Sequence, residues 1–353
     1  MDRLTKINKI LFFTLLTLAI LYVGAPFLKP FIFGILLASL MTPFCDFLES
    51  KRINRVFSSI ISTLVVFIIA GAILFLFVYQ LNNFVSEISS FREELKSFIN
   101  NIQEQIASVA NISLEEQSNI WKDRSDQFFN EVESQITQFI GGFVNSVFNF
   151  LIVLIYVILL LLYRGKLYDF IMMYIREEKK EDSKEVFAKI NTVVFHYLWG
   201  RAQVMIILAI LYYITFLIFD LPYAVLLTIF GSLITIIPYF GPFVSGLLPI
   251  VFSFVFFDSM QNVLLFTIII ITIQLTESYV LEPLIIGKEV KLNPLIVILA
   301  VVVGGLIWGI AGMVLFVPLF AMIKIISTHS AGFEPIGFLF GNASESNNKT
   351  KTP

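Results

Sequence analysis

The sequence predicts an all-α polytopic membrane protein. Of its 353 residues, 58% are hydrophobic and only 14% are charged, whereas a soluble domain is about half apolar and a quarter charged. Uncharged runs long enough to cross a hydrocarbon core about 30 Å thick recur along the chain. Two more runs are too long for one crossing and are interrupted by proline and glycine. We therefore expect about six full transmembrane helices and two broken re-entrant hairpins.

Six uncharged runs predict one crossing each: 10–28, 30–45, 56–86, 134–163, 202–219 and 259–276. The first follows three basic residues, but with so many spans downstream we interpret it as a retained helix and not a signal peptide. The fifth is expected to start before Arg201. The N-terminal half of the chain then divides into three transmembrane helices (1–80), an extracytoplasmic amphipathic segment (81–139), a fourth transmembrane helix (140–163) and a charged cytoplasmic helix (164–192). The remainder divides into a transport core (193–328), which contains the hairpins 221–257 and 292–327, and a largely disordered tail (329–353).

Basic residues in the loops predict the orientation. Segment 164–189 carries seven Lys or Arg residues, whereas 81–133 carries four basic and ten acidic residues. Because Lys and Arg are enriched in cytoplasmic loops, we place 164–189 inside and 81–133 outside. The same assignment puts both termini in the cytoplasm.

The outside segment 81–139 has apolar residues at spacings of three and four, beginning with Leu81, Phe84, Ile88 and Phe91. This spacing is typical of an amphipathic helix. The segment could be a helical hairpin that caps the molecule or an element that holds a homo-oligomer together, and the two interpretations are compatible.

The stretch "TIIPYFGPFVSGLLPI" (235–250) places helix-breaking residues within an apolar run. In lipid, broken backbone is tolerated only where it is buried in protein or lines a water-filled cavity. The halves on either side, 222–237 and 243–257, would be about 24 and 22 Å long as helices, too short to span comfortably. We expect a re-entrant hairpin with four candidate pathway residues at its tip: Pro238, Tyr239, Gly241 and Pro242.

The second broken run, 292–327, repeats this plan with Gly304 and Gly305 as candidate pathway residues. By the orientation above, the two hairpins enter from opposite sides. Opposed broken hairpins are typical of inverted-repeat transporters, which bind substrate where the repeats meet. The alternative is that glycine and proline are simply frequent in membrane helices.

Two polar groups interrupt the apolar spans. Gln274 and Glu277 lie three residues apart and so share a helix face; an intramembrane carboxylate is a candidate proton or cation site. Glu277 could instead lie solvated at the cytoplasmic interface. In "FHYLWGRAQ" the candidates are His196, Arg201 and Gln203. Arg201 could extend to the interface or pair with a ligand, and His196 could titrate near neutral pH.

Composition and motifs argue against several function classes. A net charge of −2 gives no basic surface for nucleic acid. The single cysteine, Cys45, allows no intrachain disulfide and argues against a thiolate metal cluster. The chain has no HExxH or GxxxxGK[ST] motif and no GxSxG in a strand–turn–helix context. We expect neither an enzyme nor a bound cofactor.

Three stretches resemble the autoinducer-2 exporter (AI-2E) family of membrane proteins. They are "FGILLASLMTPFCDFLESKRI" (33–53), "YLWGRAQ" (197–203) with "LPYAVLLTIFGSLITIIPYFGP" (221–242), and "ESYVLEPLIIGKEVKLNPLIVILAVVVGGLIWGIAGMVLFVP" (277–318). The resemblance covers the chain except 81–133 and the tail. Two positions depart from the family pattern: Arg201 follows Gly200 where glutamine is frequent, and Asn293 precedes Pro294 where histidine is common.

The resemblance implies a multi-spanning permease, homo-oligomeric and pentameric in the family's description. It implies either export of autoinducer-2, a small furanosyl signal, or exchange of Na⁺ or Li⁺ for H⁺. The expected partners are the lipid bilayer, further copies of the chain, and a small polar solute or monovalent cation. Two alternatives stay open: a passive channel, and a non-transporting scaffold that acts through its extracytoplasmic helices.

Overall fold

The computed structural model describes residues 2–110, 114–286, 292–330 and 332–341, and within these ranges it is helical with no strand. The elements are α1 (Asp2–Val23), α2 (Ala25–Ser50), α3 (Arg55–Ser86), α4 (Ile88–Ala110), α5 (Leu114–Gly141), α6 (Phe143–Met173), η1 (Glu177–Lys179), α7 (Lys180–Ile218), α8 (Ala224–Ile234), α9 (Phe240–Phe256), α10 (Met260–Thr276), η2 (Glu277–Ile286), α11 (Pro294–Trp308), α12 (Ile310–His329) and α13 (Glu334–Phe340).

Six helices of the described chain are long and apolar enough to cross a membrane: α2, α3, α6, α7, α10 continued by η2, and α12. The predicted fold class is confirmed. The six helices are not the six that the sequence predicted. Among the described helices the first predicted span is missing, because the apolar part of α1 (Leu11–Val23) is short, and α12, with 20 residues, takes its place. The second broken run therefore contains one helix of spanning length.

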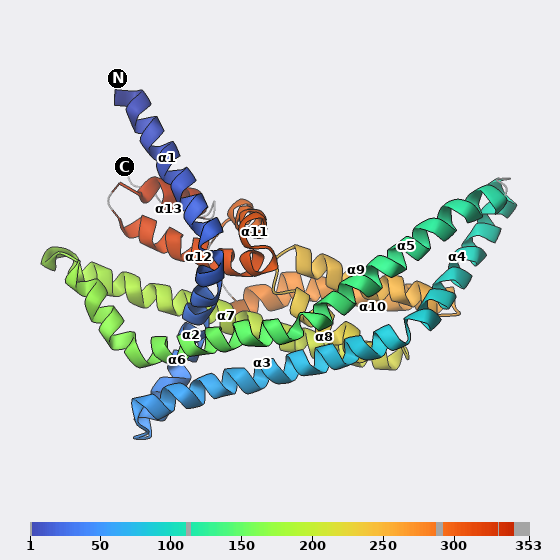
Figure 1. Cartoon of the computed structure of the whole chain (residues 1–353), viewed down its shortest axis with the longest axis horizontal. Coiled ribbons are helices and arrows are strands. Elements are labelled where there is room, and N and C mark those ends of the chain that lie inside the picture. The colour runs from blue at the N-terminus through green and yellow to red at the C-terminus, as the bar shows by residue number, and fades with distance from the viewer. Residues whose placement is uncertain (1, 111–113, 287–291, 331, 342–353) are drawn as a thin grey trace.

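The first two apolar runs do not form the antiparallel pair that the sequence indicated. The Gly24 amide donates to the Ile20 carbonyl at 2.8 Å, and the Leu28 amide donates to the Gly24 carbonyl at 2.8 Å. Helical hydrogen bonding thus continues across Gly24, and α1 runs on into α2 without reversing (Figure 1). Pro26 lies in the first turn of α2, where its missing N–H costs no hydrogen bond.

Helix α7 is the central element of the bundle. It packs against α2, α8, α10, η2 and α12, while α2, α3 and α6 pack against one another. The long helices α3, α6 and α7 run lengthwise through the molecule, and α1 and α2 cross them steeply (Figure 1). Each broken hairpin thus has a helix that packs against α7: α8 in the first hairpin and α12 in the second. The first hairpin contributes to a hydrophobic cluster that includes Tyr212, and the second to a separate cluster that includes Trp308.

The segment 81–139 forms two helical arms, α4 and α5, that project from one end of the bundle (Figure 1). Helix α4 continues α3 after a break at Glu87 and packs on α5 and α9. The Phe91 ring stacks on Phe252 and Phe256 of α9, with ring centroids 5.0 and 5.7 Å apart. Part of the apolar face is therefore covered within the chain, as in the capping interpretation; the oligomerisation role stays a prediction.

The second hairpin is held by close backbone contact. Gly309, with φ of 66°, makes the turn between α11 and α12. A Cβ atom on Gly304 would lie 2.3 Å from the Gly312 carbonyl oxygen, and a Cβ on Gly312 would lie 1.9 Å from that of Gly304. The two helices approach so closely because neither glycine has a side chain.

Substituting Gly312 by alanine should therefore lower the free energy of unfolding by about 2 to 3 kcal/mol, because overpacking forces the backbones apart. Gly71→Ala in α3 is the matched control, since a Cβ there meets no atom within 4 Å; it should raise the stability slightly, by up to about 1 kcal/mol. Reversible unfolding in mixed detergent micelles measures both. Equal changes in the two variants would contradict the close packing.

The tail contains one more helix than the sequence indicated. Helix α13 packs on α12, and Phe340 stacks on Phe320 at 5.4 Å between ring centroids. The Asn293 side chain caps α11 through the Ile296 amide (2.9 Å) and donates to the Leu339 carbonyl (2.6 Å). The expected disorder of 342–353 lies outside the described residues.

Candidate functional site

A buried ion pair joins α7 to the end of the α10–η2 helix. The Arg201 guanidinium donates from Nη1 to Glu282 Oε1 at 2.6 Å, with side chains 5% and 35% exposed. Close packing brings the two elements together: a Cβ on Gly200 would lie 3.2 Å from the Ile285 carbonyl oxygen. The sequence offered extension to the interface or pairing with a ligand for Arg201; in the structure the guanidinium pairs instead with Glu282 of the same chain.

Glu277 is fully buried, and neither of its carboxylate oxygens has a hydrogen-bond partner. It is therefore not solvated on the surface of the chain. The charges of Arg201 and Glu282 both act on it electrostatically. Glu277 opens η2, a π-helical segment containing Pro283; such segments are rare and occur frequently at functional sites. An unpaired carboxylate in this place is costly when ionised, so a bound proton or cation would stabilise it.

One turn away, Gln274 joins three helices by hydrogen bonds. Its Nε2 atom donates to the Tyr212 hydroxyl on α7 at 2.6 Å and to Ser245 Oγ on α9 at 3.0 Å. The Gln274 Oε1 atom is buried without a partner. Gly246 makes room for this amide, because a Cβ there would lie 3.2 Å from Gln274 Cγ and Nε2. A free amide acceptor on this side chain can receive a donor from a small polar ligand.

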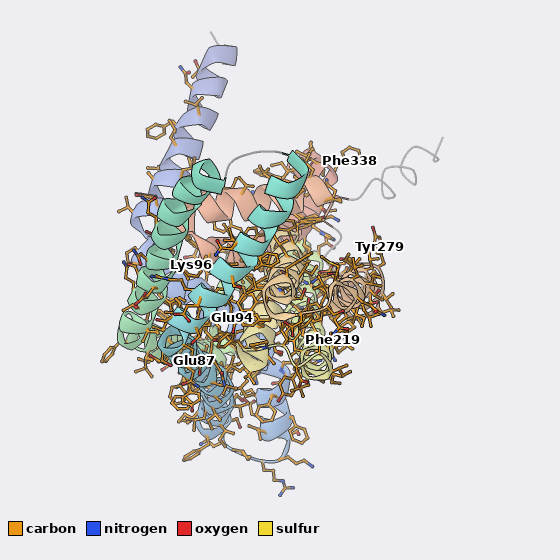
Figure 2. All side chains as sticks on the ribbon, turned by 90° about the vertical axis from the view of Figure 1, so that its right-hand side faces the viewer. Glu87, Glu94, Lys96, Phe219, Tyr279 and Phe338 are labelled. Carbon is orange, nitrogen blue, oxygen red and sulfur yellow. The ribbon has the colours of Figure 1, made fainter. Side chains whose placement is uncertain are left out.

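Three residues of the site lie at similar distances along their helices. Arg201 is 17 positions from Ile218, Tyr239 is 17 from Phe256, and Glu277 is 17 from Met260, which is about 26 Å of helix in each case. The far ends of α7 and α9 lie together, since Phe219 and Phe257 stack with ring centroids 5.8 Å apart. Figure 2, viewed toward the end that carries α4 and α5, marks Phe219 there.

The tip of the first hairpin carries Tyr239. Its side chain is 54% exposed and lies within the electrostatic range of Glu282, and its backbone has a positive φ of 65°. Gly241 is required here, because a Cβ would lie 2.1 Å from the Ile234 carbonyl oxygen. Pro238 and Pro242 are partly buried on either side of this turn. The helix thus breaks sharply between α8 and α9 at the expected position, and the re-entrant placement of this tip in the membrane stays a prediction.

Other candidates lie elsewhere. The exposed His196 ring bonds only to its own helix, through Thr192 (2.8 Å), and Gln203 is exposed. Tyr279 is 76% exposed and points outward at the edge of the bundle (Figure 2). Gly304 and Gly305 lie outside the Arg201 cluster. They lie in the contact between α11 and α12, in which Gly305 faces Met313.

Three residues of the site were missed by sequence reasoning: Tyr212, Ser245 and Glu282. Glu282 carried a signal, because it is the second carboxylate in an apolar stretch, five residues after Glu277. Tyr212 and Ser245 carried none, since tyrosine and serine are ordinary in membrane helices. Among the described residues, no group of three His, Cys, Asp or Glu side chains could hold a metal ion.

Comparison with known proteins places this arrangement in a family. The family model for AI-2E family transporters matches residues 11–332. The chain belongs to the AI-2E transporter family. It is 24% identical over 315 residues to YrrI of Bacillus subtilis (strain 168), provisionally named a transport protein, with 85% of each chain covered. It is 23% identical over 325 residues to the AI-2 transport protein TqsA of Escherichia coli (strain K12), with 90% of each covered.

A protein from an archaeon is also similar to the chain. MJ1177 of Methanocaldococcus jannaschii, also provisionally named a transport protein, is 23% identical over 303 residues, with 84% of this chain and 88% of the relative covered. The chain is therefore a multi-pass membrane transporter of the AI-2E family. The match includes α7, the first hairpin and α10–η2, which supply all the residues of the polar site.

Proposed function

We propose that this AI-2E transporter couples movement of a small polar solute or monovalent cation to binding of a proton or cation at Glu277. The observation that carries the proposal is the charge balance of the α7 and α10–η2 cluster. One guanidinium, Arg201, faces two carboxylates, Glu277 and Glu282, and Glu277 has no hydrogen-bond partner. One proton or one Na⁺ would balance the remaining negative charge.

The polar groups define a path along α7. It starts at Tyr239 on the hairpin tip, passes the Arg201–Glu282 pair and Glu277, and reaches the amide of Gln274. We infer that the pathway opens where Glu282 is partly exposed, and that the hairpin moves to open the other end. Broken helices suit this role, because their backbone carbonyl groups and helix ends can contact ions and polar solutes.

A hydroxylated solute is favoured by the second half of this path. Tyr212, Ser245 and Gln274 offer two hydroxyl groups and a free amide oxygen, which match the donors and acceptors of a small polyol. The name of TqsA describes an AI-2 transporter, so export of autoinducer-2 is the first solute to test. Exchange of Na⁺ or Li⁺ for H⁺ through Glu277 is the second candidate.

We place the protein in a bacterial plasma membrane, with the linked ends of α2, α3 and α6 in the cytoplasm. Arg164 on α6 pairs with Asp46 and Glu49 of α2 there, at 2.5 and 2.9 Å. This end carries Lys51, Arg52, Arg55, Arg164 and Lys166, as cytoplasmic ends do. We do not assign the N-terminus to either side of the membrane. The charge-based assignment assumed that the chain reverses after α1, whereas α1 continues into α2. We keep a homo-oligomer as an expectation for the arm α4–α5.

Flux in proteoliposomes tests this proposal. Autoinducer-2 transport and Na⁺/H⁺ exchange are measured side by side under imposed proton and sodium gradients, with protein-free vesicles as the control. We expect flux of at least one kind that responds to a gradient. Flux that ignores both gradients would instead support a passive channel. If neither flux occurs and disrupting α4–α5 abolishes the cellular function, the scaffold alternative holds.

A further inference from the structure

A cavity lies away from the Arg201 site, between α2, α3, α6 and α7. Its volume is about 460 Å³ and it is open on one side, a size typical of small-molecule sites. One part is apolar, formed by Ile35, Leu160 and Leu167. The other part offers Ser39, Thr42 and Asn191 together with two arginines, Arg55 and Arg164.

The guanidinium of Arg55 lacks a close anion. It lies against α6, where it donates from Nη2 to the Leu161 carbonyl at 3.5 Å, and a Cβ on Gly165 would lie 3.6 Å from its Nη1 atom. Its ion pair with Glu49 is long, at 3.9 Å. The Nε atom is buried and has no hydrogen-bond partner. The Nη2 atom thus has only a weak hydrogen bond, and the Nε atom has none. A strong acceptor such as a phosphate oxygen could replace the weak partner and fill the empty position.

Arg164 has closer ion pairs than Arg55, but one of its N–H donors at the cavity has no hydrogen-bond partner. Its Nη2 atom binds Asp46 and Glu49, whereas its buried Nη1 atom has no partner. The two acidic residues do not line the cavity. Lys51, Arg52 and Lys166 lie nearby in sequence, so the positive charges at this end outnumber the negative ones. An anion in the cavity would therefore contact the guanidinium donors directly. The carboxylates of Asp46 and Glu49 would lie behind Arg164, outside the cavity lining.

We propose that this cavity binds the phosphate headgroup of an anionic phospholipid. Phosphate oxygens accept two parallel hydrogen bonds from a guanidinium, a geometry that suits Arg55. The apolar part would receive the first carbon atoms of the acyl chains, and basic pockets between transmembrane helices are suited to anionic lipids. A free phosphate-bearing solute has the same headgroup chemistry but no use for Ile35, Leu160 and Leu167, and for this reason we favour the lipid.

A lipid in this place would link four helices. It would contact α2, α3 and α6 and also Phe187 and Asn191 of α7, the helix that carries Arg201. The site shares no residue with the path from Tyr239 to Gln274, so it is independent of the proposed function. Its occupancy should stabilise the folded bundle, because a ligand that binds only the native state adds to the stability.

The test uses the full-length protein purified in detergent. Native mass spectrometry measures retained phosphatidylglycerol, with zwitterionic phosphatidylcholine, which has no net charge, as the control, and thermal unfolding measures the stabilisation by each lipid. Three variants are compared: Arg55→Gln, Lys51→Gln and Ser39→Leu. Lys51 lies four residues before Arg55, is exposed and does not line the cavity, so its variant removes the same charge outside the site. Ser39→Leu fills the cavity and changes no charge.

We expect Arg55→Gln to weaken phosphatidylglycerol binding about tenfold, Ser39→Leu to weaken it similarly, and Lys51→Gln to leave it unchanged. Gel filtration confirms that each variant is folded. Equal losses in the Arg55 and Lys51 variants would overturn the proposal, because binding would then follow surface charge alone. Equal retention of phosphatidylcholine would also overturn it, as would displacement of the lipid by millimolar inorganic phosphate, which would assign the cavity to a soluble anion.

Discussion

Replacing Glu277 by glutamine should reduce gradient-driven flux by at least about 100-fold, equivalent to roughly 3 kcal/mol for the lost interaction with a charged group. Glutamine has nearly the shape of the protonated acid but can neither release a proton nor neutralise a cation. Because Glu277 is fully buried without a hydrogen-bond partner, the variant should remain folded. Flux in proteoliposomes and unfolding in mixed micelles measure the two effects separately.

Glu181→Gln is the matched control for this substitution. Glu181 lies at the exposed start of α7 and pairs with Lys184 at 2.6 Å, and a surface pair of this kind contributes less than about 1 kcal/mol. Its flux should equal that of the wild type. If Glu277→Gln retains gradient-driven flux, Glu277 is not the coupling site. If instead it fails to fold, the native carboxylate has a structural role that the proposal does not include.

The second large effect is expected at Arg201. Arg201→Gln removes the cation of a buried pair and leaves both Glu277 and Glu282 without a compensating charge. Breaking a buried pair costs about 3 to 5 kcal/mol, and we expect the lower end because Glu282 is 35% exposed. The free energy of unfolding in mixed micelles should fall accordingly, and transport should be lost together with it.

A double-mutant cycle separates the pair from other effects of the substitution. Glu282→Gln should restore part of the stability lost in Arg201→Gln, because it removes one of the two uncompensated carboxylates. The restoration should be incomplete, since Glu277 remains. Strict additivity of the two single changes would show that the Arg201–Glu282 contact contributes nothing to stability.

The helices of the membrane region were largely predictable, because apolar runs of spanning length have few alternatives in lipid. The direct continuation of the first run into the second was not. Lys29 and Pro30 looked like a boundary, but both residues lie inside α2, and helical hydrogen bonding continues across Gly24. A lysine can extend along a helix toward water, and an interior proline removes one helical hydrogen bond without always ending the helix, so packing decides where a helix ends.

The site was predictable only in part, and for a related reason. Glu277 and Arg201 stood out because charge is rare in apolar runs, yet the sequence left their environment open. Their burial depends on how η2 packs against Gly200, which no local pattern encodes. Ser245 and Tyr212 meet Gln274 only because α7, α9 and α10 converge, so their roles became visible in the structure alone.

The central claim is that the polar line beside α7 is the transport pathway, and solvent access to Ser245 tests it most directly. The single cysteine, Cys45, is buried and can be replaced by serine to give a cysteine-free background. In that background, Ser245→Cys is compared with Leu208→Cys, a residue equally buried in the apolar core. A membrane-impermeant thiol reagent should label position 245 under a driving gradient and leave position 208 unlabelled. Absence of labelling at 245, or equal labelling at both positions, would contradict the account.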